Sequence, residues 1–389
     1  MTTLISFLGK NRRDPTTGYQ RATYRFDNGH TVQTAFFGSA LMQQLRPART
    51  LLLGTAGSMW DALDIDTDAP EWPALIEATE RSDVDQALLD RVSVRTRASM
   101  AGAELVLMPY ARSEAEQMAL LADLAARVTQ GEQVVLDITH GFRHLPLLAL
   151  VAARYLGHVR GAAVAGIYYG ALEMTSTDGI TPVLKLDGLL RMLDWIEAFA
   201  AHDASGNYAA FAPLLVHDGL RPASAAQLQR AAHLERVTNA SEAREIITPM
   251  LGEIGQLGGA TRLFARQLMQ RLEWARKPSR QTRELALHEA YLARSDFLRA
   301  SIYLQESMIS GACDQLRVGS SSGSHAHREN MRQVLKENQA FKDLSDIRNM
   351  LAHGTVSGDN TRTTAAKAAT ATAAALASRL RQLGKELLR

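Results

Sequence analysis

Cysteine is almost absent from the sequence: Cys313 is the only one among 389 residues. No disulfide can therefore form within one chain, and a cysteine-rich zinc site is excluded. We expect the protein to reside in a reducing, cytoplasmic compartment.

Long apolar runs and signal-peptide features are also missing. No stretch of about 18 consecutive apolar residues occurs, so no membrane span is expected. The apolar run at 4–8 is followed by Lys10, Arg12 and Arg13, whereas a signal peptide carries its basic residues before such a run. The run therefore predicts a first β-strand.

An excess of one charge is lacking as well. The chain has 43 Lys and Arg against 41 Asp and Glu, a formal net charge of +2, which argues against a protein that coats a polyanion but allows a local basic site. The phosphate-binding patterns G-x4-G-K-[ST] and G-x-G-x-x-G do not occur, so ATP hydrolysis and dinucleotide redox chemistry lose support. No internal repeat is present.

The first half of the chain alternates strand and helix patterns. The turn Asp27-Asn28-Gly29 between two alternating segments predicts a hairpin. Helices are expected at 113–130, where Ser113 and Glu116 are typical of an N-terminus, and at 143–157. Strands are expected at 4–9, 18–26, 30–38, 50–57, 104–110, 133–141, 162–170 and 181–188. This alternation predicts a mostly parallel, Rossmann-like α/β sheet, whose ligands bind beyond the carboxyl ends of the strands.

After Gly188 the sequence has helical patterns without a convincing strand. The helices are expected at 207–217, 222–256, 259–275, 281–310, 328–353 and 362–388, with a Gly/Ser loop at 319–327 that carries His325 and His327. Since 389 residues suit two domains, we predict an α/β domain at 1–190 and an all-α domain at 191–389.

The clearest candidate site is DITHGFRH at 137–144, where an apolar strand ends and a helix begins. A helix N-terminus there is a natural phosphate site, because it offers free N–H groups and the positive end of the helix dipole. The candidate ligand-binding residues of this segment are Asp137, Thr139, His140, Gly141 and Arg143. Other strand ends add Gly9, Lys10, Thr55 and Ser58, and either Trp60 or Tyr168 could stack on a base.

Two other interpretations of this edge remain open. The glycine-containing loops could be ordinary turns. Alternatively, His140 and His144, four residues apart, could bind zinc with Asp137, although Arg143 within the cluster would oppose a cation.

The segment Asp137-Ile138-Thr139-His140-Gly141 resembles the D-x-T-H-G signature of a family of CRISPR-associated proteins of type III systems. These proteins combine an N-terminal CARF domain, which senses cyclic oligoadenylates, with a C-terminal α-helical HEPN ribonuclease domain. The HEPN signature is an arginine, four to six residues and a histidine, and the segment from Arg348 to His353 fits it with Asn349 after the arginine.

The resemblance implies a homodimeric endoribonuclease, or a higher oligomer, that cleaves single-stranded RNA without a metal or cofactor. Its activator would be a cyclic oligoadenylate bound at the CARF domains, cyclic tetra-adenylate first and cyclic hexa-adenylate second. The implied catalytic residues are Arg348, Asn349 and His353.

The chemistry of these residue types agrees with that implication. Cleavage by the neighbouring 2′-hydroxyl needs a base, an acid and a cation for the developing phosphorane charge. His353 can serve either proton role, and Arg348 can bind a phosphate with two parallel hydrogen bonds. On an ideal helix, five residues place the two side chains about 140° apart. A two-fold dimer, which supplies two of each, would therefore complete the site.

Arg348 and His353 could also have purely structural roles, and the chain could have another function. Arg348 could be an exposed helical arginine, and His353 a residue favoured by the helix dipole at a C-terminus. The chain could be a non-catalytic, ligand-controlled transcription regulator, although no helix-turn-helix with a basic recognition helix is evident. The α/β site could also cleave its own ligand through Thr139, His140 or Lys10. A set of basic residues at spacings of about three to five could form a charged helix face that steers RNA, or an ordinary solvated surface: Arg262, Arg266, Arg271, Arg276, Lys277, Arg280 and Arg283.

Overall fold

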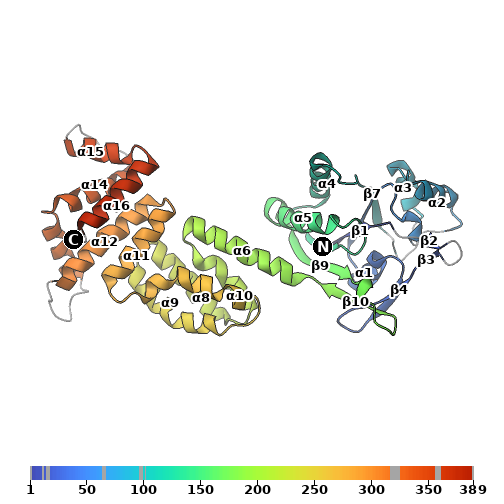
Figure 1. Cartoon of the computed structure of the whole chain (residues 1–389), viewed down its shortest axis with the longest axis horizontal. Coiled ribbons are helices and arrows are strands. Elements are labelled where there is room, and N and C mark those ends of the chain that lie inside the picture. Colours follow the sequence, from blue (N-terminus) through green and yellow to red (C-terminus); the bar gives the residue numbers. More distant parts are fainter. Residues whose placement is uncertain are drawn as a thin grey trace. The chain divides into compact units, whose positions relative to one another are not determined.

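The computed structural model describes residues 2–10, 13–14, 18–63, 67–95, 100, 102–315, 325–354 and 361–387. The chain divides into two compact units, Met1–Leu190 and Arg191–Arg389 (Figure 1). Within the described residues, no helix has both the length and the apolar character needed to cross a membrane.

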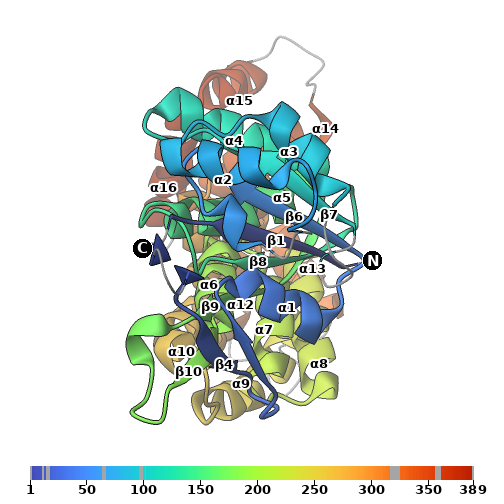
Figure 2. The ribbon, with the colours of Figure 1, turned by 90° about the vertical axis from the view of Figure 1, so that its right-hand side faces the viewer.

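Eight described strands of the first unit form one sheet in the order β5-β4-β10-β9-β8-β1-β6-β7 (Figures 1 and 2). Neighbours pair in parallel from β9 through β8, β1 and β6 to β7, whereas β10 runs antiparallel to β9. A separate short pair joins β2 (Arg13–Asp14) to β3 (Gly18–Tyr19). The strands of the large sheet are β1 (Thr2–Leu8), β4 (Ala22–Arg25), β5 (Thr31–Thr34), β6 (Arg49–Gly54), β7 (Ala103–Leu107), β8 (Gln133–Asp137), β9 (Ala163–Gly170) and β10 (Ile180–Lys185).

Both faces of the sheet are covered, which explains the continuous apolar runs of its strands. Along β1, Leu4 and Leu8 belong to one core, whereas Ile5 and Phe7 belong to the core on the opposite face. Helices α1 (Phe37–Leu45), α2 (Trp72–Arg81) and α3 (Gln86–Ser93) contribute to the first core. Helices α4 (Glu114–Arg127) and α5 (Leu145–Arg160) contribute to the second. The predicted mostly parallel α/β sheet is confirmed.

The predicted hairpin is present, but its second strand is shorter than expected. Strands β4 and β5 pair antiparallel around a turn in which Gly29 has a φ of 81°, a value that favours glycine. The expected strand at 30–38 was wrong beyond Thr34, because α1 begins at Phe37. Phe36 and Phe37 are fully buried, so they continue the apolar pattern of the strand without belonging to it.

The second unit is all-helical over the residues that the structure describes, as predicted. A single core runs through it, and α12 packs against α11, α13, α14 and α16 (Figure 1). Its helices are α6 (Asp187–Ser205), which begins in the first unit, α7 (Ala212–His217), α8 (Pro222–Arg236), α9 (Ala240–Gly255), α10 (Thr261–Arg271), α11 (Arg280–Ala293), α12 (Phe297–Gln315), α13 (His325–Leu335), α14 (Gln339–His353), α15 (Thr361–Thr370) and α16 (Ala373–Leu387).

Four expected helices are each divided in two. The segment 328–353 is divided between α13 and α14. The segment 222–256 is divided between α8 and α9 at Thr238, which has a φ of 68°, and 281–310 is divided between α11 and α12 at Ser295, with a φ of 60°. The segment 362–388 is divided between α15 and α16. The expected loop at 319–327 was wrong for His325 and His327, which begin α13; its residues 319–324 lie outside the described residues.

Candidate functional site

The first candidate site lies at the carboxyl edge of the parallel strands. Within the parallel part of the sheet, β1 lies between β6 and β8. The next parallel strand after β1 is β6 on one side, whereas the next after β8 is β9 on the other side. The strand order thus reverses between β1 and β8, and such a topological switch point is the position at which open α/β sheets bind ligands. The loops after β1 and β8 carry the predicted residues at 9–10 and 137–143.

The two loops meet through glycines. A Cβ atom on Gly9 would stand 2.3 Å from the backbone nitrogen of Gly141, and Gly141 itself has a φ of 117°. The Gly9 carbonyl also accepts a hydrogen bond of 2.8 Å from the Met59 backbone nitrogen, in the loop after β6. Three loops are thus joined backbone to backbone, and the absence of a side chain at Gly9 permits it.

Asp137 and Thr139 hold this edge together rather than present free ligand contacts. Asp137 is fully buried and accepts hydrogen bonds from Ser6 Oγ on β1, at 2.5 Å, and from the Thr139 backbone nitrogen, at 2.9 Å. Burial raises the pKa of its carboxyl to about 6. The Thr139 hydroxyl accepts a hydrogen bond of 2.8 Å from the Gly170 backbone nitrogen at the end of β9.

His140 is also engaged within the fold. Its Nε2 atom accepts a hydrogen bond of 3.1 Å from the backbone nitrogen of Phe37, the first residue of α1. Burial lowers the pKa of the imidazole to about 4, so the ring is neutral at physiological pH. With Nε2 accepting from α1, the N–H of the neutral ring is on Nδ1, and a donation from His140 to a phosphate would come from that atom.

In the loop after β6, the predicted residues Thr55, Ser58 and Trp60 likewise form hydrogen bonds within the fold. Ser58 Oγ donates to the Leu8 carbonyl oxygen at 2.6 Å, and the Thr55 backbone nitrogen donates to Ser58 Oγ at 2.9 Å. Trp60 is fully buried, and its indole Nε1 donates to the Thr55 carbonyl oxygen at 2.9 Å. Trp60 was wrongly predicted as a stacking residue, since no face of its ring is accessible.

The remaining predicted residues are available to a ligand. Gly141 and Arg143 are exposed, and so is Lys10, whose Nζ donates to Ser82 Oγ at 3.1 Å. Tyr168 is half-buried, with Lys185 Nζ 5.9 Å from its ring centroid. These four residues remain candidate ligand contacts.

An aromatic and basic cluster at this edge was missed. The ring centroids of Tyr110 and Phe142 lie 5.8 Å apart, and the Arg112 guanidinium lies 4.3 Å from the Tyr110 centroid. Phe142 is 41% exposed, and Arg112 is exposed. Between Tyr110 and Arg112, Ala111 has a φ of 55°, a strained backbone for a residue with a Cβ. The signal in the sequence was an aromatic and a basic residue directly after the strand at 104–110.

The zinc alternative is not supported by this arrangement. The Nε2 atoms of His140 and His144 contact the Phe37 nitrogen and the Tyr110 carbonyl oxygen, respectively. Over the part of the chain that the structure describes, no group of three or more His, Cys, Asp or Glu residues is placed to hold a metal ion.

The second candidate site is the C-terminal half of α14. Asn338 caps the start of this helix by accepting from the Phe341 nitrogen, and Gly354, with a φ of 70°, ends it. Phe341, Leu344 and Ile347 face the core. Arg348 follows Leu344 by four residues, so it lies beside this face and is half-buried, whereas Asn349 is exposed. A helix at this motif is present, as predicted.

Arg348 and His353 lie in different surroundings on α14. Arg348 is half-buried; its Nη2 donates to Asn349 Oδ1 at 2.5 Å, and its Nε is buried without a hydrogen-bond partner among the described residues. Arg348 and Asn349 line a cavity of about 470 Å³, whereas His353 is exposed at the helix end and is not part of that lining. One chain therefore does not bring the arginine and the histidine together.

The predicted charged face of the helical unit is partly used in local contacts. Arg271 forms two hydrogen bonds with Asp203, of 2.7 and 2.5 Å, and Arg280 donates to Glu284 at 2.8 Å. Arg283 donates to the backbone carbonyl oxygens of Lys277 and Pro278. A continuous RNA-steering face from these arginines is therefore not supported.

Comparison with known proteins defines the class of the first unit. Residues 3–173 match the family model described as "CRISPR system endoribonuclease Csx1, CARF domain". The α/β unit thus carries a CARF domain, as predicted. Nearly the whole chain is in addition similar to the CRISPR-associated protein MJ1674 of Methanocaldococcus jannaschii, with 22% identity over 381 residues. That alignment covers 87% of this chain and 59% of the relative, so the chain spans less than two thirds of the relative's length.

Proposed function

We propose that the chain is the subunit of a homodimeric ribonuclease of a CRISPR system, activated by a cyclic oligoadenylate and cleaving single-stranded RNA. The observation that carries the proposal is the placement of Arg348 and His353 at one end of α14, in a chain whose other unit matches a CARF domain. The family model's own description, an endoribonuclease, supports the same activity.

The activator would bind at the carboxyl edge of the sheet. The exposed cations Lys10, Arg112 and Arg143 suit the phosphates of a cyclic oligoadenylate. The exposed ring of Phe142 suits an adenine face. Cyclic tetra-adenylate is the first choice and cyclic hexa-adenylate the second. Because the ligand is a ring with repeated units, a second copy of the chain would contact its other half.

Catalysis would need no metal. The 2′-oxygen of a ribose attacks the adjacent phosphorus while its proton passes to His353 of one copy. The bond from phosphorus to the 5′-oxygen breaks, and that oxygen takes a proton from His353 of the other copy. Arg348 stabilises the charge on the phosphorane, and Asn349, which accepts from Arg348, orients its guanidinium. The products end in a 2′,3′-cyclic phosphate and a 5′-hydroxyl.

Dimerisation has support on the surface of α5. Leu147, Val151 and Val159, at intervals of four and eight residues, are 68%, 54% and 62% exposed, and Tyr155 completes the row at 37%. Such a row on one helix face is typical of a surface that a partner covers. A second copy would satisfy this apolar stripe and also complete the histidine and arginine pairs.

Cleavage of the ligand by the α/β unit has weaker support. Of its three candidate residues, Thr139 and His140 use their side-chain acceptors within the fold. No observation on the described residues favours a non-catalytic regulator.

The test is RNA cleavage in EDTA, with and without cyclic tetra-adenylate and cyclic hexa-adenylate. We expect ligand-dependent cleavage by the wild type and its loss in His353→Ala. Equal behaviour of the two proteins would end the proposal, and ligand binding without cleavage would favour the regulator.

A further inference from the structure

A basic cavity adjoins Arg348 between α12, α13 and α14. Its volume is about 470 Å³, which is within the range of small-ligand sites. Four of its lining side chains are basic, and one is acidic: Arg332, Lys336, Lys342 and Arg348 against Asp346. The cavity therefore has a local excess of positive charge in a chain whose total charge is nearly balanced.

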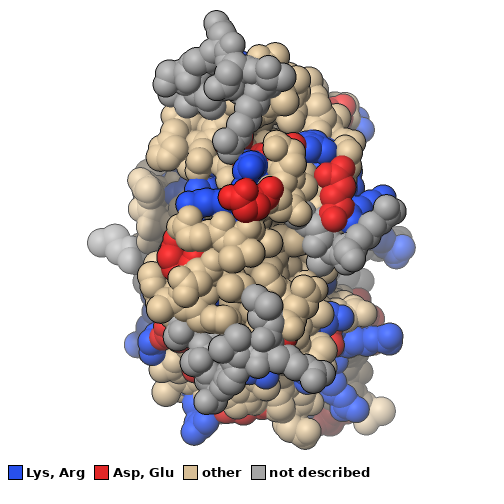
Figure 3. All heavy atoms as spheres, turned by 90° about the vertical axis from the view of Figure 1, so that its left-hand side faces the viewer, with Lys and Arg blue, Asp and Glu red and all other residues tan. Residues whose placement is uncertain are grey.

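The face of the helical unit drawn in Figure 3 has no such local excess over a broad area. Basic and acidic side chains stand next to each other there, and uncharged surface separates these groups. That face therefore offers a polyanion no broad attractive surface.

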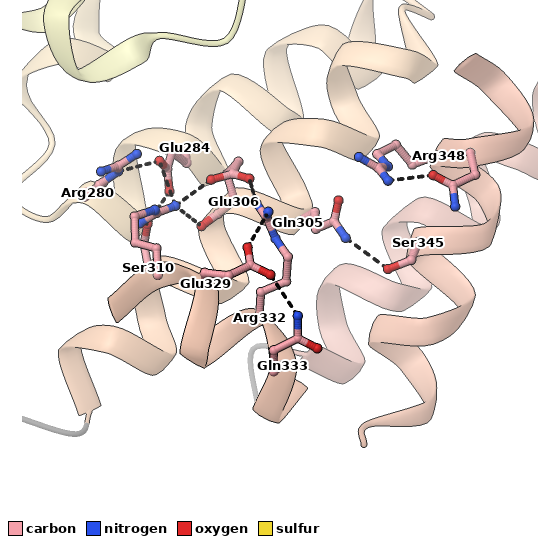
Figure 4. Close-up of polar contacts among 12 residues, drawn as sticks. Arg280, Glu284, Gln305, Glu306, Ser310, Glu329, Arg332, Gln333, Ser345 and Arg348 are labelled. Carbon is pink, nitrogen blue, oxygen red and sulfur yellow. Dashed lines mark hydrogen bonds and ion pairs between the residues drawn. The ribbon is translucent and has the colours of Figure 1, made fainter. Parts of the chain in front are cut away.

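Arg332 and Lys336 differ in the charge of their hydrogen-bond partners. Arg332 donates to Glu306 at 3.0 Å and to Glu329 at 3.1 Å, and Glu306 also accepts from Arg328 at 2.6 Å (Figure 4). These pairs fix the Arg332 guanidinium but offset part of its charge. Lys336 is exposed, and its Nζ donates to the neutral Gln333 Oε1 at 2.8 Å. Lys336 therefore offers its charge and further N–H donors to a ligand.

The cavity suits a sugar–phosphate backbone rather than a stacked base. Phe341, the aromatic residue in its lining, is 1% exposed and offers no ring face. Gln305 donates to Ser345 Oγ at 2.9 Å, and Figure 4 draws this pair beside Arg332 and Arg348. The Nε of Arg348 is buried without a hydrogen-bond partner among the described residues, whereas its Nη2 donates to Asn349 Oδ1.

We infer that this cavity binds single-stranded RNA at a phosphate next to the one that is cleaved. The inference rests on the proposed ribonuclease function and names a substrate subsite for it. Neighbouring phosphates of RNA are linked through one ribose. A strand whose scissile phosphate contacts Arg348 must therefore pass an adjoining nucleotide close to the cavity that Arg348 itself lines. Recognition through the backbone makes this contribution independent of base sequence.

The test measures binding of fluorescent single-stranded 2′-O-methyl RNA, which has no free 2′-hydroxyl to attack. The full chain carrying His353→Ala, with cyclic tetra-adenylate present, is titrated by anisotropy over a series of KCl concentrations. Lys336→Gln and Arg332→Gln are compared with Lys385→Gln, an exposed lysine on α16 away from this cavity. Because Lys336 is exposed, its replacement is not expected to disturb folding, and a thermal unfolding scan checks this.

We expect Lys336→Gln to raise the Kd about 3- to 10-fold and to reduce the slope of log Kd against log salt by about 0.7, the value of one lost contact with a single strand. Lys385→Gln should leave both unchanged, and oligo-A and oligo-U should behave alike. Equal slopes for Lys336→Gln and Lys385→Gln, or no RNA binding by the parent chain, would overturn the inference. A cavity-dependent slope without any cleavage by the wild type would support the subsite and reject the ribonuclease.

Discussion

Gly9 and Gly141 lie so close that a methyl group on Gly9 would stand 2.3 Å from the Gly141 backbone nitrogen. This contact joins the loop after β1 to the loop after β8 at the switch point of the sheet. The backbones can approach in this way because neither residue has a side chain. The geometry of the candidate ligand site therefore depends on two residues that provide no functional group.

The first prediction concerns Gly9→Ala. The added Cβ atom must push the two loops apart, so we expect a loss of about 1–3 kcal/mol in the free energy of unfolding and weaker binding of cyclic oligoadenylate. Gly188→Ala is the matched control, because a Cβ at Gly188 meets nothing within 4 Å. Thermal unfolding and calorimetric titration measure both effects. Normal binding by Gly9→Ala would show that the close approach is dispensable.

The second prediction separates a structural residue of the motif from a ligand-binding one. His140→Phe removes the acceptor of the Phe37 nitrogen, so we expect it to lower the free energy of unfolding by about 1–3 kcal/mol. Arg143→Ala removes an exposed cation, so we expect an unchanged melting temperature and about 10-fold weaker ligand binding. The reverse pattern in these two measurements would contradict the assignment.

The third prediction tests whether the RNA site is shared between two copies. Wild type is mixed with His353→Ala at constant total concentration and allowed to exchange subunits. If both histidines are needed, cleavage should fall as the square of the wild-type fraction; a site within one chain would give a linear fall. His233→Ala, an exposed histidine in the last turn of α8, is the control and should leave the rate unchanged at every ratio.

The fourth prediction concerns the apolar stripe on α5. In Val151→Glu a two-fold axis places a second carboxylate in the same interface, so we expect the dimer to dissociate and RNA cleavage to be lost. Leu263→Glu changes an equally exposed leucine on α10 and should alter neither property. Light scattering coupled to size exclusion gives the mass. A Val151→Glu dimer with full activity would rule this surface out as the interface.

The fifth prediction is a pH dependence that originates in the helical unit. Glu235 is buried, accepts from Tyr291 Oη at 2.6 Å, and has a pKa raised to about 7 by burial. Its pKa in the unfolded chain is about 4.3. Between these values the folded chain retains a proton that the unfolded chain has released, so this group makes stability fall as pH rises through that window.

Glu235→Gln should remove this fall, because an amide does not ionise and still accepts from Tyr291. We therefore expect the melting temperature of the variant to rise relative to wild type between about pH 4 and pH 7, and to keep a constant offset above that. Glu245→Gln, an exposed glutamate on α9, is the control. A pH-independent offset for Glu235→Gln would indicate that the carboxyl has the same pKa in the folded and the unfolded chain.

The sequence was sufficient to predict those elements whose signals are local. The run at 134–136 is apolar because both faces of β8 are covered. Ser113 accepts from the Glu116 nitrogen at the start of α4, as its capping pattern indicated. The divisions at Thr238 and Ser295 were not predictable, because each residue adopts a positive φ without being glycine. Tertiary contacts determine those conformations rather than local preference.

The candidate site was predicted in place but not in detail. The sequence located the edge at 137–143 and named His140 as a ligand candidate, but it did not reveal that one ring nitrogen of His140 contacts a helix that begins 103 residues earlier. Trp60 was considered as a residue that could stack on a base, but its ring is fully buried in the core. Such roles depend on contacts between distant segments, which no local pattern reveals.

The hydrogen bonds of the D-x-T-H-G segment have a consequence for specificity. Asp137 binds β1 through Ser6, Thr139 binds the end of β9, and His140 binds the start of α1. The signature therefore connects β1, β9 and α1 to the end of β8. We expect the choice of ligand to depend on side chains outside the signature or at its margin. Chains could change their preferred ring size through such positions while the signature stays intact.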